Sequence, residues 1–132
     1  MSGRVREHGI TVGHRPTGPL NAITDVAGVR VGHSTVREDG PVVARTGVTA
    51  IRPNDGDIFM ERLVGGAFVL NGAGEMSGLI QVLEWGLVET PILLTNTMSV
   101  GAVSAATVGW MLDRYSTIGI PRRHRGHRGG DP

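Results

Sequence analysis

Two segments of this 132-residue chain share one order of residue types, and each ends in polar groups that could bind a ligand. Residues 67–78 read AFVLNGAGEMSG, and residues 91–101 read PILLTNTMSVG. In both, large aliphatic residues precede an asparagine, then small residues and a helical pattern. A buried strand that leads into a helix in this way leaves backbone N–H groups without an internal partner. Side chains placed there can hold a ligand or fix a tight structural join.

Four side chains at these junctions are candidates for supporting a pocket: Asn71, Glu75, Asn96 and Ser99. The two amides could lock loops or act as oxyanion donors. Ser99 could instead cap the helix that follows, and Glu75 could complement the dipole of its helix. The glycines of residues 72–78 follow a G-x-G-x-x-x-G spacing, and Glu75 would set a carboxylate against a pyrophosphate. A nucleotide site is therefore the weaker interpretation.

The other reactive side chains form no recognised catalytic motif. No serine lies in a G-x-S-x-G elbow, the chain has no cysteine, and Asp25 is expected to fix a turn. His124 and His127 stand in a segment without apolar residues, so we predict no metal site there. Ser2 could become an N-terminal nucleophile once Met1 is removed, but no rigid strand would aim it. We expect no catalytic residue and no metal ligand in this chain.

The composition is that of one globular domain. Hydrophobic residues make up 39% and charged residues 19%, which argues against a disordered chain. No apolar stretch reaches membrane-spanning length, and residues 1–15 form a polar segment without one. We therefore expect a cytoplasmic protein that makes no contact with a membrane.

The basic charge is gathered towards one end of the chain. All 13 basic residues are arginines, and four of them lie among the last eleven residues. We predict that residues 118–132 form a basic disordered tail. A basic arm for nucleic acid and the translation of GC-rich DNA in a shifted frame are the two other interpretations. Nucleic-acid binding ranks last because the globular part has no clustered basic face in its sequence.

The elements that must position the candidate residues follow from hydrophobic patterning. We predict a strand or hairpin at 23–36, a charged turn at 37–41, strands at 45–51, 65–70 and 90–95, and helices at 76–86 and 100–115. The strand at 65–70 carries no charge and is expected to be buried on both faces. Gly86 is expected to end the first helix. The order β-β-β-α-β-α predicts a layered α/β domain.

Four blocks of this chain, in order, resemble the DmpA-type L-aminopeptidase/D-esterase family, which includes the β-peptidyl aminopeptidases. They are GPLNAITDVAGVRVGHST (18–35), RTGVTAI (45–51), FVLNGAGE (68–75) and TPILLTNTMSVG (90–101). The resemblance implies a precursor that cuts itself into an α and a β chain. The new N-terminal Ser or Thr is then the nucleophile, and its own α-amine is the general base. It also implies an α/β/β/α sandwich, assembly of αβ units into homo-oligomers, and no metal or organic cofactor.

The implied substrates are short peptides, amino acid amides and amino acid esters, from which the enzyme releases an N-terminal amino acid. The match ends near Tyr115, before the family's self-cleavage site, so no catalytic residue is carried over. We therefore expect residues 16–117 to be the N-terminal part of an aminopeptidase α chain, a truncated sandwich that is inactive without its β-chain half. The alternatives are a non-catalytic partner or scaffold subunit that pairs with a separately encoded β-like chain, and a basic-tailed nucleic-acid binder.

Overall fold

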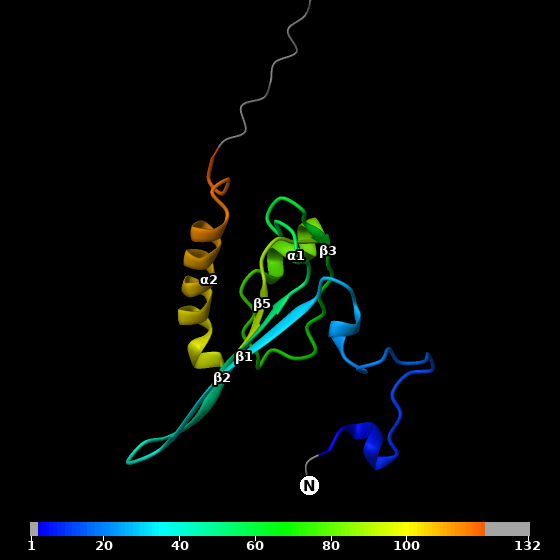
Figure 1. Ribbon diagram of the computed structural model, residues 1–132. Helices are drawn as coiled ribbons and strands as arrows, with labels where there is room; N and C mark the ends of the chain where they lie inside the picture. Colours follow the sequence, from blue (N-terminus) through cyan, green and yellow to red (C-terminus); the bar gives the residue numbers. More distant parts are fainter. Residues whose placement is uncertain (1–2, 121–132) are drawn as a thin grey trace, which may run out of the picture.

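The structure is a computed structural model that describes residues 3–120, and a long β-hairpin dominates it (Figure 1). The strands are β1 (Arg30–Asp39), β2 (Val43–Arg52), β3 (Leu63–Val64), β4 (Leu87–Val88) and β5 (Ile92–Leu94). The helices are α1 (Leu79–Trp85) and α2 (Val100–Arg114), with short 3-10 turns η1 (Val5–His8), η2 (Ile23–Asp25) and η3 (Thr97–Ser99). The α/β class predicted from the sequence is confirmed. The predicted order is wrong by one strand, because β4 lies between α1 and β5.

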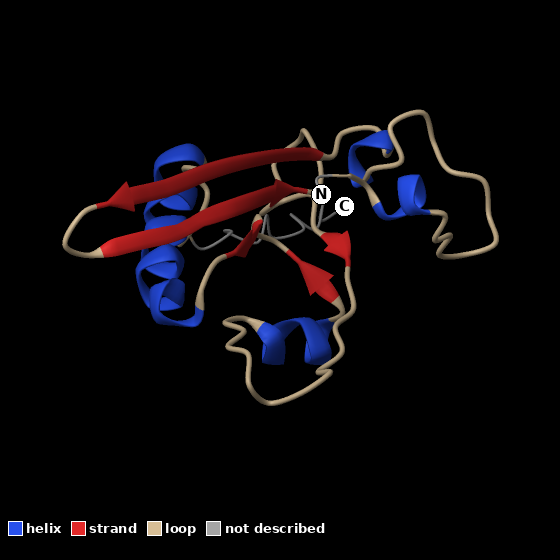
Figure 2. Ribbon diagram, turned by 90° about the horizontal axis from the view of Figure 1, so that it is seen from below, coloured by secondary structure: helices blue, strands red, loops and turns tan. Residues whose placement is uncertain are grey.

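The hairpin of β1 and β2 is antiparallel and regular over its whole length, with Thr35 opposite Gly47 and Arg37 opposite Arg45. The charged residues 37–39 continue β1, so the prediction of a turn from residue 37 is wrong. Their side chains can point to solvent because the distal part of the hairpin projects beyond the other elements (Figure 2). A charge run is therefore no obstacle to a strand here. A Cβ at position 47 would lie 2.3 Å from the carbonyl oxygen of Ser34, so this close approach of the strands requires glycine.

The third strand of this sheet is β5, which pairs antiparallel with β2 to give the order β1-β2-β5. Ile92 lies opposite Ile51, and Leu94 lies opposite Thr49. The strand predicted at 90–95 thus forms, in a shorter version. Immediately after it, the Thr95 hydroxyl donates a hydrogen bond of 3.0 Å to the carbonyl oxygen of Gly47 and fastens the end of β5 to β2.

The prediction of a fully buried strand at residues 65–70 is wrong. The strand in this region is β3, which precedes it and pairs with β4. The ladder ends with a hydrogen bond of 2.9 Å from Gly65 N to the carbonyl oxygen of Gly86. Beyond that point no strand lies beside the segment within residues 3–120, and Phe68 and Leu70 are each 86% exposed. An apolar run becomes a buried strand only when a neighbour pairs with it and covers it.

Both predicted helices form. Gly86 ends α1 in the left-handed conformation, at φ 65°, where glycine carries no steric penalty. The second helix matches its predicted range to within one residue. The side chains buried among the described residues are Ile58, in the loop after β2, and Met111 and Tyr115, at the end of α2. Because this core is so small, most large apolar side chains of the described chain are in contact with solvent.

The region before the hairpin is held by Asp25, whose carboxylate accepts hydrogen bonds from Leu20 N at 3.0 Å and Ala22 N at 3.1 Å. Its predicted role in a turn is confirmed. Residues 121–132, with His124 and His127, lie outside the described residues, as does Ser2. No helix within residues 3–120 has both the length and the apolar character needed to span a membrane.

Candidate functional site

Of the four candidates, Asn96 makes the most side-chain hydrogen bonds within the described chain. Its Nδ2 donates a hydrogen bond of 2.6 Å to the Oγ1 of Thr46 on β2, while its Oδ1 accepts one of 3.1 Å from the backbone N–H of Ser99. The second bond caps the first turn of η3. The Ser99 side chain makes no capping bond, so the helix entry is fixed by the asparagine and not by the serine. Asn96 therefore joins the sheet to the start of α2.

Asn71 and Glu75 lie together in the exposed loop between β3 and α1. The Oδ1 of Asn71 accepts a hydrogen bond of 3.0 Å from Ala73 N, which is the geometry of an Asx turn. Glu75 stands before Gly78, the N-cap of α1, and so lies outside the first turn of the helix. The suggestion that Glu75 complements the helix dipole is therefore wrong, because that effect fades within one turn.

The four candidates form two separate groups. Asn96 and Ser99 contact each other, but no hydrogen bond or ion pair in the described chain links either of them to Asn71 or Glu75. Residues 65–70, which were predicted to form the strand before Asn71, do not form one. Their placement around one pocket consequently stays a prediction.

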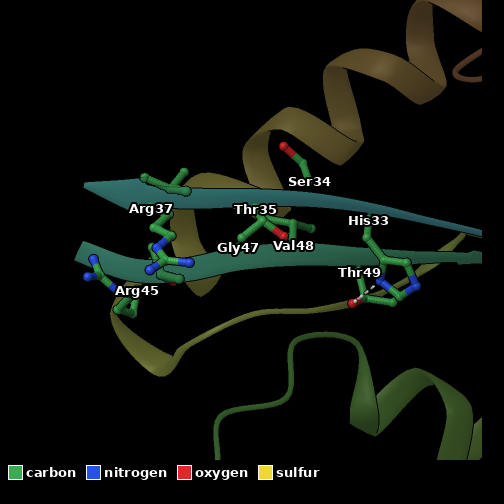
Figure 3. A pocket seen from close by; sticks show the side chains of 10 residues that line it. His33, Ser34, Thr35, Arg37, Arg45, Gly47, Val48 and Thr49 are labelled. Carbon is green, nitrogen blue, oxygen red and sulfur yellow. Dashed lines mark hydrogen bonds between the residues drawn. The ribbon is translucent and has the colours of Figure 1, made fainter. Parts of the chain in front are cut away.

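An open hollow of about 430 Å³ lies along the hairpin, lined by residues 33–37 and 45–49 (Figure 3). It contains none of the four candidates, although Thr46, the partner of Asn96, is among its lining residues. His33 and Thr49 face each other across the strands, with 2.9 Å between Nδ1 and Oγ1. Ser34 points to the other side of the hairpin, towards α2 (Figure 3).

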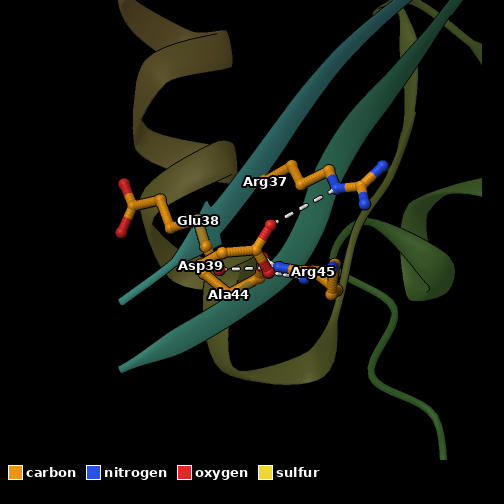
Figure 4. Close-up of polar contacts among 5 residues, drawn as sticks. All are labelled: Arg37, Glu38, Asp39, Ala44 and Arg45. Carbon is orange, nitrogen blue, oxygen red and sulfur yellow. Dashed lines mark hydrogen bonds and ion pairs between the residues drawn. The ribbon is translucent and has the colours of Figure 1, made fainter. Parts of the chain in front are cut away.

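The distal end of the hollow carries charge (Figure 4). The Arg45 guanidinium donates to the carbonyl oxygens of Glu38, at 2.6 Å, and Ala44, at 2.8 Å, and it forms an ion pair with Asp39. The Nε of Arg37 lies 3.8 Å from the second oxygen of Asp39. Their pairing closes the end of the hairpin. Because these groups are exposed, it adds little to the free energy of unfolding.

A second ion pair fixes the opposite end of the hairpin. Arg30, the first residue of β1, contacts Asp55 in the turn that follows β2. The hydrogen bond from Arg30 lowers the pKa of the Asp55 carboxyl below its usual value, and the same bond raises the pKa of Arg30. Arg52 adds hydrogen bonds to the carbonyl oxygens of Asp55 and Gly56. The turn at residues 53–56 is thus tied to both strands.

Within the described chain, these residues can bind and brace but do not assemble a nucleophile with an oriented base. The His33 and Thr49 pair has the spacing of a base and a hydroxyl, yet no third side chain holds the imidazole and the pair lies on an open face. No group of three or more metal-ligating side chains occurs within residues 3–120. Sequence patterning missed this pair because only the strand register places residue 33 opposite residue 49.

Residues 21–126 match peptidase family S58, and the chain belongs to that family. The resemblance expected from the four sequence blocks is thereby confirmed, but the prediction that the match ends near Tyr115 is wrong, because it runs to residue 126. Among curated proteins, the β-peptidyl aminopeptidases BapA of Sphingosinicella microcystinivorans and Sphingosinicella xenopeptidilytica are 42% and 43% identical over 118 and 117 residues. These alignments cover 83% and 84% of this chain but 29% of each relative. The chain therefore spans less than a third of the length of the curated relatives it matches.

The solved structures that resemble the chain in fold include the following three. The PH0078 protein of Pyrococcus horikoshii OT3 is 43% identical, with a TM-score of 0.81 over 89% of this chain and 35% of its own. A β-aminopeptidase of a Burkholderia species is 46% identical, with a TM-score of 0.78 over 86% and 33%. The L-aminopeptidase D-Ala-esterase/amidase of Ochrobactrum anthropi, described as a variant of the Ntn hydrolase fold, is 38% identical, with a TM-score of 0.74 over 86% and 32%.

Proposed function

We propose that this chain is the N-terminal part of a self-processing aminopeptidase or esterase that releases N-terminal amino acids from peptides, amides or esters. The observation that carries this proposal is 42% identity over 118 residues to a β-peptidyl aminopeptidase of which only 29% is matched. The remaining length would complete an α/β/β/α sandwich and supply the catalytic groups. The complete αβ units would then associate into homo-oligomers.

In the complete enzyme, the hydroxyl of a new N-terminal Ser or Thr attacks the carbonyl carbon of the substrate, and the α-amine of the same residue takes the hydroxyl proton. The amine or alcohol of the substrate leaves with a proton, and water then releases the amino acid from the acyl-enzyme. This chain contributes a scaffold to that reaction. Asn96 braces the sheet against α2, and we propose that Asn71, Glu75 and Ser99 support the same pocket once it is complete. No cofactor enters the proposal.

The isolated chain is expected to be inactive because the nucleophile belongs to the part that it does not span. The test is to incubate purified chain with alanine p-nitroanilide beside a complete family enzyme as positive control. The expected result is no release of nitroaniline above the buffer blank. Rapid, saturable release by the chain alone would overturn this part of the proposal.

A second candidate function is that of a non-catalytic partner subunit for a separately encoded β-like chain. The observation that favours it is the large number of apolar side chains left uncovered within residues 3–120. A neighbouring reading frame that encodes the missing part, with a Ser or Thr after a small residue, would support this alternative. Nucleic-acid binding depends on residues 121–132, which lie outside the described residues. It predicts salt-dependent binding that is lost when those residues are deleted.

A further inference from the structure

Residues 66–70, here called the apolar segment, are apolar in sequence, yet their large side chains are exposed to solvent. Their sequence is Gly-Ala-Phe-Val-Leu, within a run from Leu63 to Gly74 that carries no charged side chain. Nevertheless, Phe68 and Leu70 are almost fully exposed, and Val69 is exposed as well. An apolar surface without charge is typical of the buried centre of an interface.

The backbone of the apolar segment is also without partners. Its N–H and C=O groups make no hydrogen bond to any other residue within 3–120, because the ladder of β3 and β4 ends at Gly65. Aromatic and β-branched residues such as Phe68 and Val69 favour strands. The segment thus has the composition of a strand and the free backbone groups that a pairing strand would need.

The helix that follows presents a second uncovered surface. Ile80 and Leu83 lie three residues apart on α1 and therefore share one face, and both are exposed. Helix α1 has seven residues, which is too short to be stable in water without packing. An exposed apolar stripe on so short a helix indicates that something else covers it in the working protein.

The share of its relatives that this chain does not span points to the occupant. The curated and structural relatives extend over about three times the length matched here, since the chain covers 29–35% of each of them. We infer that the apolar segment is a docking strand for the rest of the S58 fold, which pairs with its backbone and covers Phe68, Leu70 and the exposed stripe of α1. This inference rests on the proposed function and names the surface through which the parts of the enzyme join.

The experiment combines the full 132-residue chain with a second polypeptide, the part of the Burkholderia β-aminopeptidase that lies beyond its match to this chain. Size-exclusion chromatography with light scattering measures the complex, and hydrogen exchange measures protection of residues 66–70. The expected result is an equimolar complex, or a multiple of it, in which the apolar segment exchanges slowly. Phe68→Asp is expected to weaken the complex about tenfold or more, because it places a charge in a buried contact.

Val42→Asp is the matched control, because Val42 is an apolar side chain of similar exposure, 77%, in the turn of the hairpin. It is expected to leave the complex unchanged. Near-ultraviolet circular dichroism checks that both variants keep the fold. Hydrogen exchange of residues 66–70 in the unmodified chain tests the inference without any substitution.

The outcomes separate this inference from the proposed function. A mixture that hydrolyses alanine p-nitroanilide while residues 66–70 stay unprotected would overturn the docking strand alone. A complex through residues 66–70 without hydrolysis would uphold the docking strand and count against the proposed activity. Protection that arises from a dimer of this chain, with no second polypeptide bound, would overturn the inference. The absence of any complex would count against both.

Discussion

Asn96 and Thr46 lie fifty residues apart in the sequence and are joined by a hydrogen bond of 2.6 Å between Nδ2 and Oγ1. The Oδ1 of the same amide caps η3. One side chain thus fixes the angle at which the chain leaves β5 for α2, and it does so by bonding to Thr46 of β2, a residue that lines the hollow of the hairpin. The join is structural in this chain.

Replacing Asn96 by alanine is expected to lower the free energy of unfolding by about 1–2 kcal/mol, through loss of a helix cap and of a bond between side chains. The measurement is urea denaturation followed by tryptophan fluorescence. Thr46→Val removes only the bond between the Thr46 and Asn96 side chains, so its cost should be about 1 kcal/mol. The double variant should cost less than the sum of the two single changes. Strict additivity would mean that the contact between Asn96 and Thr46 contributes nothing.

Elements whose partners are close in sequence were predictable from it. The helix at 100–115 and the strand at 45–51 follow from their own patterns, and the Asp25 turn follows from its residue type. The lack of a strand at 65–70 was not predictable, because pairing of this run depends on a neighbour that no local pattern specifies. The two-residue strand β4 is too short to produce any periodicity.

The candidate site shows the same contrast between features set by local sequence and features set by distant partners. Asn96 could be selected because it follows a strand and precedes a helix, but its partner Thr46 is defined only by the packing of β5 on β2. The contact between His33 and Thr49 depends on the register of the hairpin, and a shift of one residue would break it. Catalytic groups could not be assigned from the sequence, because the chain spans less than a third of the length of the curated relatives it matches.

Gly47 is expected to tolerate no side chain. Gly47→Ala would place a Cβ 2.3 Å from the Ser34 carbonyl oxygen, so the hairpin must shift at a cost of about 1–3 kcal/mol. Gly32→Ala is the control in the neighbouring strand, because nothing lies within 4 Å of a Cβ at that position. Thermal unfolding of the two variants should therefore separate clearly. Equal melting temperatures would contradict the close approach of β1 and β2 at residue 47.

The pairing of Asp55 with Arg30 predicts a pH dependence with a definite sign. Because the bond lowers the pKa of Asp55 in the folded chain, its contribution is complete above the usual carboxyl pKa. The contribution is lost as the pH falls through the lowered value. Asp55→Asn should therefore be less stable than the unmodified chain at pH 7, and the difference should shrink towards pH values below about 4. Urea denaturation at both pH values provides the measurement.

Glu38→Gln is the control for that experiment, since the Glu38 carboxylate has no ion pair among the described residues. It should show a smaller change between the two pH values. Added salt should also reduce the Asp55 effect, because both partners are exposed. An Asp55 effect that grows as the pH falls would have the wrong sign and would exclude the ion pair as its source.

Because the core is small, one side chain is expected to contribute a large share of the free energy of unfolding. Ile58 is 0% exposed and packs with Met111 and Tyr115, so it holds the end of α2 against the loop that follows β2. Ile58→Ala is expected to cost about 2–5 kcal/mol, which is a large share of the stability that so small a core can supply. Ile80→Ala, at a site 79% exposed, should change stability by less than about 0.5 kcal/mol.

The readout for this pair of variants is fluorescence, because Trp110 lies 6.0 Å from Tyr115 in an edge-to-face contact and reports on the same cluster. Loss of the native spectrum in Ile58→Ala but not in Ile80→Ala would establish that the contacts of α2 hold the described chain together. The second polypeptide from the Burkholderia β-aminopeptidase can then be added to Ile58→Ala. If it restores the native signal, contacts with the exposed apolar side chains must supply the stability that the small core lacks. If Ile58→Ala leaves unfolding as unchanged as Ile80→Ala does, Ile58 is not part of a cooperative core.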